Sequence, residues 1–520
     1  MSKIDVIKEN IQFQKLLRED NSTTILKDEY LIPDTHPDVQ EILMVEAKPL
    51  IVNKEVMGDK VMLEGRIEYN IIYIPREDNM ALNSVKYIEK FTNYLDLREE
   101  EHKAICEVEC KTEHIEAMVM NERKIRIEGI MKLDFELYKG VEFEFVTDIQ
   151  GAEGVQVKKD IEPVSRLAAS KKVELISKSM IRVGMDKPQV LKILTCSMLL
   201  HKKEIKISED KVNMSCYCNI NILYLGSETK DVLSLVDDVY ISKEEEVVGI
   251  SSNMIPYVSY EIENSDITLE EDDLGEIRII NTEFLVKAKL KVFSKEDINI
   301  VKDAYSTKFP IEINKDGNEV GIIHGIQESE TVVKDNIYIK EGDLKPEQIV
   351  VVVANINVTD KNISDNRLTI EGIINTKILY RTSSEEKGFG QVEGDIPFVI
   401  GIDMVGMNSK MKAIVKCNLE SLDSIIEANT IGIKATINAK AKVSYEINKD
   451  FISEIIEGEG EVEEQKSSIS IYIVGKEDSI WDLAKKFKTT VDELIKINGV
   501  DEIDGIEEGS RLIIPGRAVF

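Results

Sequence analysis

The feature that most constrains the fold is a repeat with a period of about 150 residues. Aligned on Tyr73, Tyr224 and Tyr380, three stretches recur at spacings of 151 and 156 residues. They are "VMLEGRIEYNIIYI" (61–74), "VNMSCYCNINILYL" (212–225) and "LTIEGIINTKILYR" (368–381). A fixed period indicates that one supersecondary unit is used several times. We therefore expect three similar domains.

A second pattern repeats with nearly the same period. The segments "PDVQEIL", "PQVLKIL" and "PEQIVVV" begin at Pro37, Pro188 and Pro346, which are 151 and 158 residues apart. In the two outer copies a phenylalanine, Phe91 or Phe398, follows the aligned tyrosine by 18 residues, and the middle copy lacks it. We expect a short proline-led helix or a turn near the start of each domain.

Each copy ends in a run in which apolar residues alternate with polar ones. The runs are "RKIRIEGIMKLDFELY" (123–138), "GEIRIINTEFLVKAKLKVF" (275–293) and "IGIKATINAKAKVSYEI" (431–447). A period of two predicts half-buried β-strands, and the spacing of three and four that an amphipathic helix needs is absent. The sequence thus predicts a mostly β protein with three tandem β-rich repeat domains.

The expected boundaries follow from the period and from composition. The segment "EGEGEVEEQKSS" (457–468) holds two glycines and five glutamates, which is typical of a solvated linker. About 50 residues remain after it. We expect three β-rich repeats, an acidic linker and a small C-terminal module, at residues 1–162, 163–312, 313–455, 456–467 and 468–520.

The charge balance is strongly acidic, with 97 Asp and Glu against 66 Lys and Arg, a formal net charge of −31. Such a charge repels nucleic acid and anionic membranes. Either it serves solubility alone, or it favours a basic protein surface as partner.

The chain shows no sign of export or membrane insertion. Its apolar runs, such as 349–354, are too short to span a bilayer, and residues 1–14 do not have the pattern of a secretory signal. We expect a cytoplasmic protein.

One stretch resembles a zinc site and is predicted to be a strand instead. His102, Cys106, Cys110 and His114 are four residues apart in "HKAICEVECKTEH". On a strand that spacing separates neighbours by ~13 Å, whereas zinc needs its ligands within ~2.3 Å of one point. Polar residues occupy the alternate positions, which indicates a strand with one wet face. We predict no metal site here.

Other candidate sites also favour structural roles. Cys216 and Cys218 lie on the same face of a predicted strand and are expected to be core thiols, and "PDTHPD" (33–38) is typical of a proline-bounded turn. The chain has no phosphate-binding loop, no GxSxG elbow and no HExxH motif. We predict no cofactor, no catalytic residue and no enzyme activity.

The C-terminal segment has the order strand, helix, helix, strand. "IYIV" (471–474) and "RLIIP" (511–515) read as strands. Ser479 with Asp482, and Thr490 with Glu493, have the spacing of helix starts. Asn498-Gly499 is a helix end.

This module resembles a LysM domain. The residues that carry the resemblance are Tyr472, Val474, Asp478, Ser479, Ile480, Trp481, Ala484, Phe487, Val491, Leu494, Asn498, Ile506, Gly509, Leu512, Ile514 and Pro515. The resemblance implies a βααβ fold and a groove that binds N-acetylglucosamine glycans such as peptidoglycan. By position the groove residues are Glu477, Asp478, Ser479, Ile480, Ile503, Asp504, Gly505 and Ile506.

One departure from the family pattern bears on the ligand. Glu477 stands where the family usually has glycine, and a glutamate on the rim crowds a sugar ring. For the core we expect Tyr472, Val474, Trp481, Leu483, Phe487, Leu494 and Ile514. Trp481, the single tryptophan, lies one position from the apolar helical stripe, so both core and rim are open to it, and we favour the core.

The three repeats resemble the SPOCS-type domains of spore proteins, through the runs that end at Tyr73, Tyr224 and Tyr380. Three such domains, an acidic linker and one LysM domain together resemble the SipL-type spore coat morphogenetic proteins. The resemblance implies a mother-cell protein at the forespore surface that binds the coat-scaffold ATPase SpoIVA, partly through LysM. Two functions stay open: an adaptor in spore coat assembly, or a peptidoglycan-binding protein of the cortex or cell wall.

Overall fold

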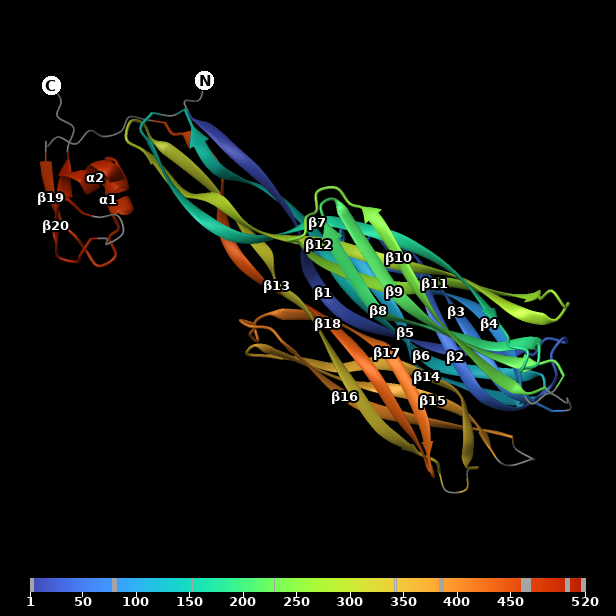
Figure 1. The fold of residues 1–520 in the computed structure, drawn as a ribbon. Coiled ribbons are helices and arrows are strands. Elements are labelled where there is room, and N and C mark those ends of the chain that lie inside the picture. Colours follow the sequence, from blue (N-terminus) through green and yellow to red (C-terminus); the bar gives the residue numbers. More distant parts are fainter. Residues whose placement is uncertain are drawn as a thin grey trace.

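The structure is a computed structural model that describes residues 4–76, 82–151, 153–228, 230–340, 342, 344–382, 388–459, 469–500 and 506–515. The chain is built almost entirely from antiparallel strands, with two short α-helices near its C-terminus (Figure 1). The prediction of a mostly β protein with a small βααβ module is confirmed.

Within the residues that the structure describes, each of the three repeats contains six strands. The first has β1 (Asp5–Leu31), β2 (Val39–Met57), β3 (Lys60–Pro75), β4 (Asn83–Asp96), the 3-10 turn η1 (Glu99–Glu101), β5 (Ile105–Asn121) and β6 (Lys124–Gln150). The second has β7 (Val155–Arg182), β8 (Val190–Ser208), β9 (Lys211–Gly226), β10 (Val232–Glu246), β11 (Ile255–Glu271) and β12 (Ile277–Ser306). The third has β13 (Ile311–Tyr338), β14 (Pro346–Ser364), β15 (Arg367–Thr382), β16 (Phe389–Asp403), β17 (Lys412–Glu427) and β18 (Thr430–Glu457).

The C-terminal module has β19 (Ile469–Ile473), α1 (Ile480–Phe487), α2 (Val491–Asn498) and β20 (Arg511–Pro515). Its two strands pair antiparallel.

Each repeat is a sandwich of two three-stranded sheets. In the first repeat one sheet has the order β1-β6-β5 and the other β2-β3-β4, and the later repeats have the same topology. The alternation of β6 explains the packing, because Ile125, Ile127, Leu133 and Leu137 are buried between the sheets while the intervening side chains are more exposed. Each repeat has one core of this kind.

The tyrosines that revealed the repeat are buried structural anchors. Tyr73, Tyr224 and Tyr380 are at most 1% exposed. The hydroxyl of Tyr73 donates to the carbonyl oxygen of Pro37 at 3.0 Å, and that of Tyr224 donates to Pro188 at 3.4 Å. The two sequence anchors are therefore physically joined. The proline-led segments form neither a helix nor a turn of their own: they lead directly into β2, β8 and β14, and in the first two repeats a turn, at residues 34–36 and 185–187, lies just before the proline.

The strands divide the chain at 151–154 and 307–310, whereas the expected boundaries after residues 162 and 312 lie inside β7 and β13. The recurring segments lie within each unit, so their period gives the length of a unit but not its first residue. Strand β18 ends at Glu457, and most of the expected linker, residues 460–467, lies outside the described residues.

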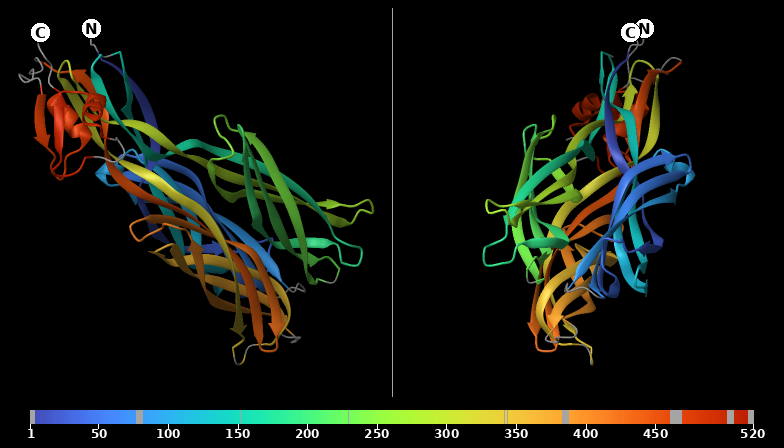
Figure 2. Two further views of the ribbon diagram at one scale, coloured as in Figure 1. Left: turned by 60° about the vertical axis from the view of Figure 1, so that its left-hand side comes forward. Right: turned by 90° about the vertical axis from the view of Figure 1, so that its right-hand side faces the viewer.

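The three repeats pack around a pseudo-three-fold axis. Strand pairing makes Phe145, Ile300 and Phe451 equivalent in β6, β12 and β18, and these three residues lie in one buried cluster. The smaller sheets also meet, in a cluster that contains residues of all three repeats, among them Leu43, Leu194 and Val351. Figure 2 shows the three units lying side by side. The repeats are thus one packed body rather than separate beads.

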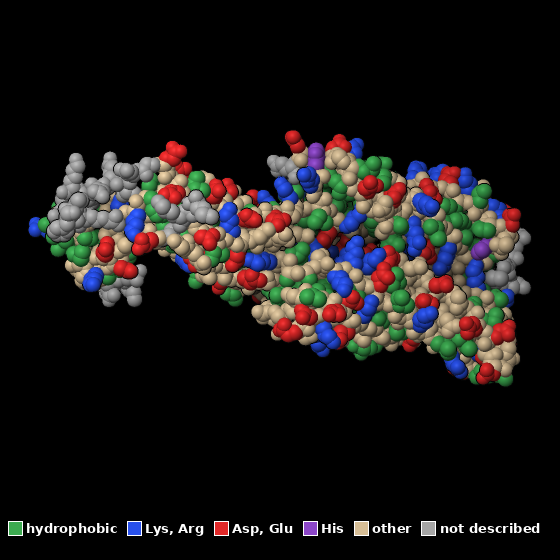
Figure 3. Space-filling view, turned by 90° about the horizontal axis from the view of Figure 1, so that it is seen from above, with side chains coloured by type: hydrophobic (Ala, Val, Ile, Leu, Met, Phe, Trp, Pro, Cys, Tyr) green, Lys and Arg blue, Asp and Glu red, His purple; other side chains and the backbone are tan. Residues whose placement is uncertain are grey.

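The ends of the long strands form a narrow stalk. Val146, Val301 and Ile452, each one residue beyond the previous set, belong to a further shared cluster. The stalk connects the broad body to the C-terminal module (Figures 1 and 3). The module therefore lies at the tip of the stalk.

Candidate functional site

The helices of the C-terminal module begin where the sequence predicts. The Ser479 hydroxyl accepts from the backbone N–H of Asp482 at 3.1 Å, and the Thr490 hydroxyl accepts from Glu493 at the same distance. Glu493 also accepts from the Thr490 backbone, which completes a capping box. Gly499 ends α2 with a φ of 60°, a conformation that favours glycine.

The module has a small core with a half-buried rim. Val474, Leu483, Leu494 and Ile514 are buried together with Ala484 and Leu512. Tyr472, Trp481 and Phe487 are only partly buried and pack against that core. The predicted core residues therefore lie together, the three aromatic ones at its edge.

Of the two loops that form the predicted groove, the structure describes the first, with Glu477 to Ile480, and only Ile506 of the second. The carboxylate of Asp478 accepts from the backbone N–H of Gly475 at 2.7 Å, and Ser479 caps α1, so both side chains stabilise the loop. Glu477 is exposed, and Ile480 and Ile506 pack against the core. Ile503, Asp504 and Gly505 lie outside the described residues.

Trp481 faces the second repeat. Its indole Nε1–H donates to Oδ2 of Asp303 in β12 at 2.8 Å. Lys485, one helical turn further, donates to both oxygens of the same carboxylate at 2.6 and 2.7 Å. Burial alone would raise the pKa of Asp303, but the hydrogen bonds from Lys485 and Trp481 outweigh it and hold the pKa below its usual value.

Tyr305 completes this contact. It is 2% exposed and belongs to the hydrophobic core of the module, although it lies in β12. Its ring meets that of Trp481 edge-to-face, with centroids 5.0 Å apart, and its hydroxyl donates to the carbonyl oxygen of Thr489 at 2.8 Å. The Lys158 ammonium lies 6.0 Å from the Trp481 ring. The stalk and the module share a core.

Sequence reasoning missed Asp303 and Tyr305, which lie 178 and 176 residues before Trp481. The sequence does contain one signal that could have revealed Tyr305, namely a difference between the repeats at equivalent positions. Tyr305 is equivalent by strand pairing to Gln150 and Ile456, so the second repeat alone has an aromatic residue at this position.

The outer face of the module's sheet is apolar and exposed. Ile469, Ile471 and Ile473 alternate along β19 and are 66%, 68% and 66% exposed, and Ile513 of β20 is 38% exposed. An exposed apolar patch on a small module is typical of a protein-binding surface.

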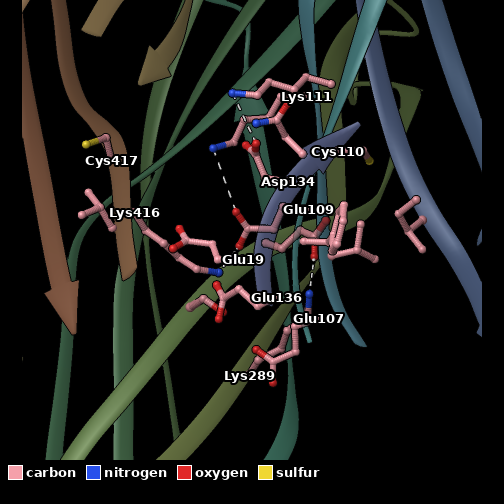
Figure 4. A pocket seen from close by; sticks show the side chains of 18 of the residues that line it. Glu19, Glu107, Glu109, Cys110, Lys111, Asp134, Glu136, Lys289, Lys416 and Cys417 are labelled. Carbon is pink, nitrogen blue, oxygen red and sulfur yellow. Dashed lines mark hydrogen bonds and ion pairs between the residues drawn. The ribbon is translucent and has the colours of Figure 1, made fainter. Parts of the chain in front are cut away.

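A charged cavity of about 750 Å³ lies between the three repeats (Figure 4). Lys416 of the third repeat pairs with Glu109 of the first, and Lys291 of the second pairs with Glu107 of the first at 2.5 Å. Burial would raise the pKa of Glu109, but Lys416 lowers it to about 2. Glu109 in turn raises the pKa of Lys416 against the opposing effect of burial. These pairs bind the repeats to one another.

Three of the four zinc-like residues lie on a strand, as predicted, whereas the polar face of that strand, with Glu107 and Glu109, lines the cavity between the repeats instead of facing bulk solvent. Cys106, Cys110 and His114 lie in β5, and His102 lies before it. Burial raises the pKa of the Cys106 thiol to about 11 and that of Cys110 to about 12, which makes both poor nucleophiles. Within the described ranges, no group of three or more His, Cys, Asp or Glu residues has the arrangement of a metal site.

The remaining candidates are also structural. Cys216 and Cys218 are buried, as predicted. The aspartates of "PDTHPD" bind Arg123, whose guanidinium donates to Asp38 at 2.8 Å and to Asp34 at 3.1 Å. Those carboxylates therefore hold the turn. In the part of the chain that the structure describes, no helix has the length and apolar character needed to cross a membrane.

Comparison with known families agrees with this architecture. The family model described as "SipL, SPOCS domain" matches residues 38–120, 189–270 and 345–427, and the LysM domain model matches residues 472–515. The three SPOCS matches run from β2 to β5 and over the equivalent strands of the later repeats, so the first and last strands of each unit lie outside them. No curated protein and no solved structure matches the chain.

SPOCS and LysM are binding domains without catalytic machinery, and their combination marks a sporulation-associated protein. The three SPOCS matches cover the inner strands of each repeat, the long first and last strands of each repeat lie outside them, and the LysM match covers the module at the tip. The chain is a member of the SipL family, with three SPOCS domains and a C-terminal LysM domain.

Proposed function

We propose that this protein is a non-enzymatic adaptor in spore coat assembly, acting in the mother-cell cytoplasm at the forespore surface. Its partner is the coat-scaffold ATPase SpoIVA, and the LysM module contributes to that contact. The family membership supports a role in sporulation. The buried, paired charges of the repeats support a scaffold rather than a catalyst.

The observation that carries the proposal is the isoleucine face of β19. Sugar rings stack on aromatic side chains, whereas exposed branched aliphatic residues favour a dry protein surface. The one tryptophan of the module, Trp481, already binds Asp303. Glu477 stands exposed where the family has glycine, which narrows the approach of a sugar ring to the first loop. Both features favour a protein partner over a glycan.

The test uses the full chain, purified SpoIVA and isolated peptidoglycan. We expect the wild-type chain to capture SpoIVA and to pass through peptidoglycan unretained. Ile471→Lys should abolish capture, because it places a charge in the apolar face, and it should leave the fold intact because the side chain is 68% exposed. Ile88→Lys, at a 64% exposed isoleucine of the first repeat, is the matched control.

The glycan alternative predicts a different pattern. Retention on peptidoglycan without capture of SpoIVA would overturn the adaptor proposal. In that case Glu477→Gly should strengthen retention further, because glycine restores the close approach that the family pattern allows.

A further inference from the structure

The tip of the second repeat differs from the other two tips in a way that bears on the LysM module. Strand pairing makes Asp303 equivalent to Asp148 in β6 and to Glu454 in β18, so all three tips carry a carboxylate. Asp148 pairs with Lys159 at 2.8 Å, and Glu454 accepts from Asn314 at 3.1 Å. Only Asp303 has a tyrosine two residues further along its strand.

Residues two apart on a strand lie on the same face. Asp303 and Tyr305 therefore present a carboxylate and a phenol side by side. The outer side of α1 supplies a partner for each of these two groups. The indole N–H of Trp481 and the ammonium of Lys485 bind the carboxylate, and the Trp481 ring packs edge-to-face against the Tyr305 ring. The carbonyl oxygen of Thr489, just after α1, accepts from the phenol. Every polar atom of the pair has a partner on the module.

We propose that the outer face of α1 is a recognition surface for a strand that carries an acidic residue and a tyrosine two positions apart. In this chain the second repeat occupies that surface through Asp303 and Tyr305. Docking on the stalk and binding of another such strand at Trp481 exclude one another, so the second repeat controls access to this face. This inference goes beyond the adaptor function and does not rest on it.

Charge at the contact fits this assignment. The module face offers Lys485, and the second repeat adds Lys158 near the Trp481 ring. The carboxylate of Asp303 therefore contacts one ammonium, that of Lys485, and one indole N–H, an arrangement that favours an anion and disfavours a lysine in its place. The pair of Trp481 and Lys485 selects a carboxylate, and the edge-to-face ring contact and the Thr489 carbonyl select the tyrosine.

The chain contains a built-in probe for this docking, because Trp481 is its only tryptophan. The experiment measures acrylamide quenching of Trp481 fluorescence in the full chain. Asp303→Lys places an ammonium against Lys485 and removes the hydrogen bonds that the carboxylate accepts from Lys485 and Trp481. The equilibrium between the module docked on the stalk and the module released from it should therefore move by at least about tenfold toward the released state. Quenching should rise accordingly.

Two matched variants separate docking from general damage. Asp148→Lys makes the same change at the equivalent tip of the first repeat and should leave quenching at the wild-type level. Combining Asp303→Lys with Lys485→Asp reverses the pair and should restore protection. Wild-type quenching in Asp303→Lys would overturn the docking, and so would a rise of equal size in Asp148→Lys.

The recognition itself is tested with the released variant. The peptide "VKDAYST", residues 301–307, should change the fluorescence of Asp303→Lys saturably and should change that of the wild-type chain far less, because its own repeat competes. A peptide with lysine in place of the aspartate is the control. If the two peptides act alike, α1 does not recognise the acidic–tyrosine pair and the proposal fails, whatever the outcome of SpoIVA capture.

Discussion

At the scale of single residues, one buried lysine lies where all three repeats meet. Lys442 of the third repeat is 6% exposed and donates to the Tyr138 hydroxyl at 2.8 Å. Its ammonium lies 4.9 Å from the ring of Tyr138, 5.4 Å from that of Tyr257 and 5.9 Å from that of Phe293. These rings belong to the other two repeats. The cation–π contacts thus join all three units at one point.

Burial of the charged Lys442 ammonium destabilises the folded state. Burial lowers its pKa from 10.5 to about 8, with Lys291 and Lys416 acting in the same direction and Glu136 and Glu107 against it. Between those two pKa values the unfolded chain binds more protons than the folded one, so this residue makes stability rise with pH over that window.

Lys442→Met should remove this pH dependence. At pH 7 the variant avoids burying a charge and should be as stable as the wild type or more stable, by up to about 2–3 kcal/mol. The difference should shrink as the pH approaches 10. Urea unfolding at pH 7 and pH 9.5 measures it, with the exposed Lys27→Met as control. A stability difference that stays constant with pH would show that Lys442 keeps its ordinary pKa.

At the scale of elements, a cross-strand pair explains the phenylalanine that recurs in the outer repeats. Phe91 in β4 lies opposite Gly65 in β3, and Phe398 lies opposite Gly372 in β15. A Cβ at Gly65 would overlap the Phe91 ring and lie 2.5 Å from the carbonyl oxygen of Leu50. Glycine therefore makes room for the ring, so a phenylalanine on one strand requires a glycine opposite it on the next.

The middle repeat solves the same packing problem differently. There the equivalent pair is Cys216 opposite Ile241, which fills the space without a ring. The middle repeat thus lacks both the phenylalanine and the glycine that lies opposite it in the outer repeats.

Gly65→Ala should destabilise the chain by about 1–3 kcal/mol, because neither the ring nor the backbone can move away at a small cost. The midpoint of denaturant unfolding measures this. Gly140→Ala in β6 is the matched control: its Cβ would meet nothing within 4 Å. That variant should be neutral or slightly stabilising. Equal losses in both variants would mean that strand propensity, not the Phe91 ring, sets the cost.

At the scale of the whole molecule, the sequence predicts the units better than their assembly. The tyrosine and proline periods, the alternating runs and the helix caps of the module are local patterns, and the structure follows them. The caps at Ser479 and Thr490 are examples, because a cap involves residues only three apart.

The assembly depends on contacts between residues far apart in sequence. Phe145 meets Phe451 at a ring-centroid distance of 5.6 Å, and nothing in the spacing of the repeats tells whether they pack together. The same holds for the docking of Trp481 on Asp303. The groove residues Ile503 to Gly505 lie outside the described residues, so their role stays a prediction.

The central claim is that the three SPOCS domains form one body whose stalk holds the LysM module. The most direct test is hydrogen exchange of the full chain carrying Phe451→Ala, a change in the third repeat only. Phe451 is 2% exposed and packs on Phe143 and Phe145 of the first repeat. We predict faster exchange not only in β18 but also around residues 141–146 of β6 and 298–301 of β12. Faster exchange confined to β13 and β18 would contradict a shared core and would mean that the repeats fold independently.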